Sequence, residues 1–172
     1  MTVPLIVVVG LLLGGAGSNG PSSAPSGPAV LPAVSAGAPQ DTRAATVSTC
    51  ARLISALPLR LAGLDLRRTE SRPPSSSIVA WGDPPVVLRC GVARPAALHP
   101  GSSAQTITVD GVTLLAEPTS ATTRYTVIDR SLYVDVDVPV RYHERPLAAI
   151  ATAVAAVLPK PVCTVDPNVV DL

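Results

Sequence analysis

The sequence predicts an α+β domain, in which an antiparallel sheet of about five to six strands carries two helices packed on one face. Three observations lead to this prediction. A segment with the apolar spacing of an amphipathic helix lies near each end of the domain. Several short segments rich in β-branched residues lie between these helices. Tight-turn signals join neighbouring segments, as is typical of antiparallel strands.

Composition and charge limit the core and the partners. Of the 172 residues, 47% are apolar, but there is one Trp, three Tyr and no Phe. The core is therefore expected to consist mainly of Val, Leu, Ile and Ala side chains. The chain has 13 basic and 12 acidic residues, for a net charge of +1. This balance argues against a nucleic-acid-binding domain, which usually carries a strongly basic surface.

The amino-terminal segment resembles an export signal. Residues 3–13 form an apolar run that is shorter than the roughly 20 residues a spanning helix needs and that fits the apolar part of a secretory signal. No basic residue precedes the run, and a buried strand of the domain is the alternative interpretation. We predict a signal peptide or membrane anchor over residues 1–16, and an exported protein that is secreted or held at the extracellular face of the membrane.

A segment poor in bulky side chains follows. Residues 17–42 are rich in Pro, Ser, Gly and Ala, which is typical of a flexible tether. A single α+β domain is predicted over residues 43–163, and an irregular tail over residues 164–172.

The first half of the domain is expected to contain one helix and three strands. Residues 44–57 have apolar side chains at helical spacing, and Pro58 ends the pattern. Residues 64–70 are expected to form a strand that is followed by a loop. Residues 78–81 and 86–92 are expected to form strands joined by a Gly-Asp-Pro-Pro turn.

The second half is expected to contain two hairpins and a helix. Asp110-Gly111 is the favoured two-residue turn between strands 106–109 and 112–115. Strands 124–128 and 132–138 are expected to flank a turn at residues 129–131. In the last strand, Asp135 and Asp137 alternate with valines, which predicts a half-solvated face. Residues 146–158 are expected to form the second helix, bounded by prolines.

Several short strings resemble one known family. The strongest are A-W-G-D-P at residues 80–84 and R-C-G-V at residues 89–92, and the weaker matches are Cys50, Leu57-Pro58, Arg67-Arg68, Asp110-Gly111-Val112 and Asp129-Arg130. Together they resemble the actinobacterial family called domain of unknown function 3515, over about residues 50–139. The resemblance implies a small envelope protein with an apolar leader, and it implies no activity.

The cysteines indicate a cross-link. Cys50 lies on the apolar stripe of the first helix, and Cys90 lies on the apolar side of a strand. A helix packed on that side would bring the two together, so an exported chain is expected to contain a Cys50–Cys90 disulfide. Cys163 is left unpaired in this scheme. The alternatives are a bond between Cys163 and Cys50, or three free thiols if the chain is not exported.

The candidate ligand-binding residues are Trp81, Asp83 and Arg89. A lone Trp beside a turn can stack on a ligand, although such a residue often packs at a sheet edge with its N–H bonded to the backbone. Arg89 faces away from the expected helix layer. It could form an anion site with Arg67 or Arg68, or a structural ion pair with Asp83 or Asp137.

No metal, cofactor or catalytic residue is predicted. His99 and His143 lack the spacing of metal ligands, and Asp135 and Asp137 alone make a poor oxygen cage. The motifs of nucleophilic elbows, P-loops and dinucleotide sites are absent from the sequence.

The sequence therefore predicts an exported or membrane-tethered envelope domain that acts as a binding or accessory module without catalysis. The expected partner is an envelope protein or a cell-wall component, and membrane anchoring would occur through the apolar leader. The alternatives are an envelope hydrolase or accessory enzyme with a site that the sequence does not show, and a structural spacer. A pocket with a perturbed acid or base would indicate an enzyme.

Overall fold

The computed structural model describes residues 31–161. The expected signal or anchor, the first part of the expected tether, Cys163 and the expected tail at residues 164–172 all lie outside these described residues. None of the helices within residues 31–161 is long and apolar enough to cross a membrane.

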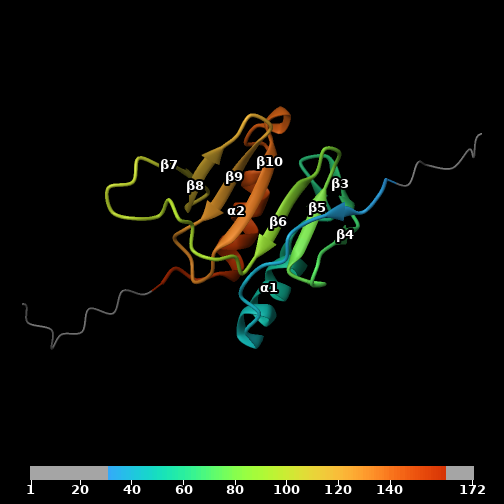
Figure 1. Ribbon diagram of the computed structural model, residues 1–172, viewed down its shortest axis with the longest axis horizontal. Coiled ribbons are helices and arrows are strands. Elements are labelled where there is room, and N and C mark those ends of the chain that lie inside the picture. Colours follow the sequence, from blue (N-terminus) through green and yellow to red (C-terminus); the bar gives the residue numbers. More distant parts are fainter. Residues whose placement is uncertain (1–30, 162–172) are drawn as a thin grey trace, which may run out of the picture. The chain divides into compact units, whose positions relative to one another are not determined.

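The fold is α+β, and its main sheet is antiparallel throughout. Eight strands form one sheet. Figure 1 labels its strands other than β2. In spatial order they are β2 (Arg60–Leu61), β3 (Leu64–Arg67), β5 (Ile78–Trp81), β6 (Val86–Cys90), β10 (Val134–Pro139), β9 (Thr122–Val127), β8 (Val112–Pro118) and β7 (Gln105–Val109).

The expected number of five to six strands is too low. The seven segments with strand-like sequence all contribute to this sheet, although the end of the first, Thr69–Glu70, pairs in a separate two-stranded sheet. β2 adds the eighth strand at the edge. β2 has only two residues, so it cannot show an alternating pattern. It pairs with β3 because Ala62 and Gly63 reverse the chain with positive φ angles of 51° and 88°.

Two helices pack on the same face of the sheet, as the sequence predicts. They are α1 (Ala44–Ala56) and α2 (Leu147–Val157), and a short 3₁₀ helix, η1 (Val140–Tyr142), precedes α2. Prolines set the helix limits, because Pro58 follows α1 and α2 lies between Pro146 and Pro159. The larger apolar core forms between these helices and the sheet.

The Cys50–Cys90 disulfide is present and joins α1 to β6. The two Cα atoms are 5.6 Å apart, and both side chains are buried within the larger core. The bond links residues that are 40 positions apart, so it closes a loop that contains β2, β3 and β5.

Residues 31–43 form a segment that we call the strap, which crosses the face opposite the helices. Its strand β1 (Val34–Ser35) pairs in parallel with β4 (Thr69–Glu70). Val34 is buried there in a second, smaller core, together with three side chains of the sheet: Ile78, Ala80 and Val87. In Figure 1 the strap is the blue segment that runs past β5 and β6 to α1.

The strap corrects the expected extent of the tether. Residues 17–42 were predicted to be flexible, but residues 31–42 are bonded to the domain. The amide of Ala36 donates to the Glu70 carbonyl at 2.9 Å, and the amide of Asp41 donates to the Gly91 carbonyl at 3.0 Å. Composition alone does not predict this order, because the strap is held by buried Val34 and Pro39, by backbone hydrogen bonds and by the side chain of Arg67 from a distant strand.

Candidate functional site

Trp81 is a core residue. Its side chain is fully buried, and its indole Nε1 donates a hydrogen bond to the Pro58 carbonyl at 3.0 Å. It belongs to the larger core on the helix side of the sheet. Trp81 therefore presents no ring face to a ligand, and the packing role weighed in the sequence analysis accounts for its contacts.

Asp83 and Arg89 lie at opposite ends of the β5–β6 hairpin. Asp83 is in the exposed turn, where its carboxylate is 4.0 Å from Nη1 of Arg67. Arg89 pairs in register with Ile78 at the other end and faces the side of the strap. Trp81 faces the helices. The three predicted ligand-binding residues therefore do not form one site.

Arg67 also has a structural role. Its Nη1 donates to the Gly82 carbonyl at 2.7 Å, and its Nη2 donates to the Pro32 carbonyl at 2.6 Å. The side chain is only 10% exposed. Arg67 thus clamps the strap to the β5–β6 turn, and it does not join Arg89 in an anion site.

Arg89 instead belongs to a row of charges that the strand register creates. Asp137 on β10 lies opposite Arg124 on β9, and Asp135 lies opposite both Arg89 and Thr126. The Arg89 guanidinium forms a salt bridge with Asp137 Oδ2, and Arg124 Nε donates to Asp137 Oδ1 at 2.9 Å. Asp137 therefore bridges two arginines.

Asp135 sits beside this bridge. Its Oδ1 accepts a hydrogen bond from the Thr126 hydroxyl at 2.8 Å, and its Oδ2 is 3.7 Å from Arg124 Nε. Burial raises the pKa of Asp135 above its ordinary value, although Thr126 and the two arginines act in the opposite direction. The hydrogen bond to Asp137 in turn raises the pKa of Arg124.

The half-solvated face predicted for this strand is therefore wrong in detail. The side chains of Asp135 and Asp137 are only 14% and 18% exposed, and both lie beside the paired arginines of neighbouring strands. The alternation of the strand is as expected, with the valines directed into the larger core.

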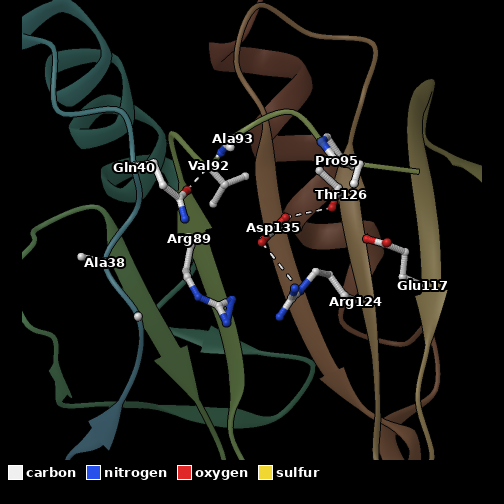
Figure 2. Close-up of a pocket in the computed structure, with 12 residues that line it drawn as sticks. Ala38, Gln40, Arg89, Val92, Ala93, Pro95, Glu117, Arg124, Thr126 and Asp135 are labelled. Carbon is white, nitrogen blue, oxygen red and sulfur yellow. Dashed lines mark hydrogen bonds and ion pairs between the residues drawn. The ribbon is translucent and has the colours of Figure 1, made fainter. Parts of the chain in front are cut away.

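Charged and polar side chains on the sheet face opposite the helices form the floor of a cavity of about 380 Å³ that we call the strap groove. Its floor comes from four adjacent strands, β6, β10, β9 and β8. The side chains on that floor are Arg89, Asp135, Arg124, Thr126 and Glu117. Figure 2 shows these side chains between the strap and the segment that follows β6.

The two walls of the strap groove are joined at one end. Gly37, Ala38 and Gln40 of the strap line one wall, and residues 92–96 contribute to the other. The Gln40 carboxamide oxygen accepts a hydrogen bond from the Ala93 amide at 3.1 Å, which Figure 2 shows as a dashed line.

Sequence reasoning missed most of the groove, although a signal for it was present. Once the hairpin at residues 124–138 is in register, Arg124 must lie opposite Asp137. Glu117 lies opposite Arg124 on the next strand. The wall provided by the strap had no such signal. Within residues 31–161, no cluster of His, Cys, Asp and Glu is suited to hold a metal ion.

Most residues of the two distinctive strings have structural roles. Trp81 anchors the core, and Cys90 forms the disulfide. Gly91 has a φ of +83°, and a Cβ atom there would be 3.0 Å from Cγ2 of Thr46. Arg89 lines the strap groove, so it connects these strings to the candidate binding site.

The comparison with family models gives a match over residues 1–162 to a family described as "Protein of unknown function (DUF3515)". The chain belongs to the DUF3515 family. This confirms the resemblance carried by the A-W-G-D-P and R-C-G-V strings. No curated protein and no solved structure matches this DUF3515 chain.

Proposed function

We propose that this DUF3515 chain is a binding or accessory module of an actinobacterial cell envelope, exported or tethered at the outer face of the membrane, with the strap groove as its binding site. The observation that carries the proposal is the concave, charged floor on the sheet face opposite the helices. Its volume of about 380 Å³ is within the range of ordinary small-ligand sites.

Asp135 is an acid of the strap groove whose pKa is raised, which is a property expected of an enzyme site. Its carboxylate is already bound by a neighbouring side chain, so we infer recognition rather than catalysis. Asp137 is engaged by two arginines, and Asp135 is held by Thr126. Side chains that brace one another present charges in fixed positions, which reduces the entropy lost when a ligand binds. The partner is an envelope protein or a cell-wall component.

Two features support the location. The Cys50–Cys90 disulfide is of the kind that persists in oxidising compartments. Residues 3–13 have the length and composition of the apolar part of a secretory signal.

The test uses the full chain, in the cells that encode it, with two matched substitutions. Arg124→Gln removes a groove charge, and Arg60→Gln removes a charge from an exposed ion pair with Asp65 at the far edge of the sheet. Fractionation and cross-linking capture are then compared. We expect the wild type and Arg60→Gln to be in the envelope fraction, to contain the disulfide and to capture the same component.

We expect Arg124→Gln to be found in the same fraction but to lose that component. Equal capture by both variants would refute the groove as the site. Recovery of the chain in the cytosol with free Cys50 and Cys90 thiols would refute the location.

A further inference from the structure

On one side of the strap groove is a negative group, Glu117, that forms no salt bridge within residues 31–161, although its charge and that of Arg124 attract each other at longer range. Glu117 is half-buried on β8 and lines the groove. Among the salt bridges within residues 31–161, none involves Glu117, although Arg124 is its cross-strand neighbour. Arg124 instead directs its Nε toward the two aspartates of β10. Figure 2 shows the Glu117 carboxylate turned toward Thr126 across the floor.

The same groove has incompletely compensated positive groups. Arg124 uses its Nε for Asp137, its side chain is 47% exposed, and its terminal nitrogens form no hydrogen bond among the described residues. Arg89 donates from Nη2 to Asp137, but its buried Nη1 has no acceptor among the described residues. Figure 2 shows both guanidinium groups pointing toward the same part of the floor.

The total charge decides which ligand fits. The charged side chains that line the groove are Arg89, Arg124, Asp135 and Glu117, and when ionised their charges sum to zero. Asp137 does not line the groove but pairs with both arginines, and including it gives the set a net charge of −1. A dianion such as phosphate would be repelled by this set. A molecule with one charge of each sign adds no net charge, and it can contact both Arg124 and Glu117.

We propose that the strap groove binds a zwitterionic amino-acid or short-peptide ligand, with its carboxylate at Arg124 and its ammonium group at Glu117. Arg89 adds positive charge from the floor beside the carboxylate. Charge-assisted hydrogen bonds of this kind are stronger than neutral ones, and a guanidinium can hold a carboxylate with two parallel bonds. This inference rests on the proposed function, because it names the ligand class of the same site.

The test measures binding of three probes to the full chain by NMR titration. The probes are L-alanyl-L-alanine, its N-acetyl derivative, which lacks the ammonium group, and its C-terminal amide, which lacks the carboxylate. We expect the wild type to bind the unmodified dipeptide about tenfold more tightly than either derivative, as the loss of one charged contact of about 1.4 kcal/mol implies.

Two groove variants should lose different preferences. Arg124→Gln should bind the dipeptide and its amide equally while still disfavouring the N-acetyl form. Glu117→Gln should bind the dipeptide and its N-acetyl form equally while still disfavouring the amide. Arg60→Gln, at the remote edge of the sheet, should behave as the wild type.

Absence of saturable shifts with all three probes, or equal affinities for them in the wild type, would overturn the zwitterion proposal. Capture of an envelope component that still depends on Arg124 would then leave the proposed function standing. The reverse outcome, with the expected peptide preferences but capture that does not depend on Arg124, would overturn the proposed function alone.

Discussion

Gly91 shows how closely the strap, α1 and β6 approach one another. Its amide donates to the Tyr133 carbonyl at 3.0 Å, and its carbonyl accepts from the Asp41 amide at 3.0 Å. A Cβ atom at this position would be 3.0 Å from Thr46 Cγ2 and 3.4 Å from the Asp41 carbonyl oxygen. The residue therefore needs both a left-handed backbone and the absence of a side chain.

Replacing Gly91 by Ala should lower the free energy of unfolding by more than the roughly 1–2 kcal/mol that a left-handed backbone costs an L-residue. Gly101→Ala is the matched control, because its φ is +79° but no atom lies within 4 Å of the added Cβ. Urea denaturation of both variants separates the steric effect from the backbone effect. Equal losses would show that Thr46 moves aside freely.

The sequence singled out Trp81 as an important residue, but it did not decide between a role in ligand binding and a role in the core. A lone Trp beside a turn is compatible with a ligand platform or with a core anchor, and only burial distinguishes the two. The ion-pair partner of Arg89 was likewise not decided by the sequence. Alternation placed Arg89 on the side away from the helices and left Asp83 and Asp137 as its possible ion-pair partners, and the structure shows that the partner is Asp137.

Replacing Trp81 by Ala should lower the free energy of unfolding by about 3–5 kcal/mol, because it leaves a cavity in the larger core. The nearby Leu59→Ala is the control, since Leu59 is 75% exposed and should change stability by less than about 0.5 kcal/mol. Soluble yield and urea denaturation check both. A Trp81→Ala protein as stable as Leu59→Ala would contradict the structural role.

At the level of elements, the hairpins were predictable and the strap was not. Asp110 and Gly111 adopt φ angles of 47° and 73°, as a two-residue turn of this sequence requires. The strap has no periodicity, because β1 is only two residues long and its partner β4 is also short. Its position depends on Arg67, which is distant in sequence.

Replacing Arg67 by Gln should loosen the strap while leaving the rest of the domain intact. The substitution removes the contacts with the Pro32 and Gly82 carbonyls. We expect faster hydrogen exchange at the amides of Val34 and Ala36, which bond to β4 and its preceding residue, and unchanged exchange in α2. Arg68→Gln is the control, because the Arg68 side chain is exposed.

Unchanged exchange at Val34 and Ala36 in the Arg67→Gln variant would show that β1 pairing holds the strap by itself. Faster exchange throughout the sheet would show instead that Arg67 supports the whole fold. Either result would contradict the inference that Arg67 holds the strap in place without supporting the rest of the sheet.

At the level of the whole molecule, the layered architecture followed from the sequence more directly than the groove did. Helical spacing at both ends and alternation between them determine which faces must be buried. The groove depends on the register of four strands and on a wall supplied by a segment of unremarkable composition. Neither the strand register nor the position of the strap is set by residues that are close in sequence. The residue pattern therefore indicated which side chains are charged, but not that they come together in one groove.

The disulfide should support the stability of the domain as a unit. For a loop of this length the chain-entropy estimate is roughly 4 kcal/mol. We expect reductant to lower the urea midpoint of the wild type toward that of the double variant Cys50→Ser with Cys90→Ser. The double variant should not respond to reductant. A wild type that is equally insensitive would show that the cross-link contributes little.

The course of the strap determines where the protein can safely be shortened. A truncated version starting at Ala44, the first residue of α1, would keep every helix but would uncover Ile78, Ala80 and Val87, which Val34 now shields. Such a protein would expose an apolar patch to water and would tend to aggregate. The natural place to attach a label, a fusion partner or a surface linker is therefore ahead of Leu31, upstream of the point where the polypeptide meets Arg67.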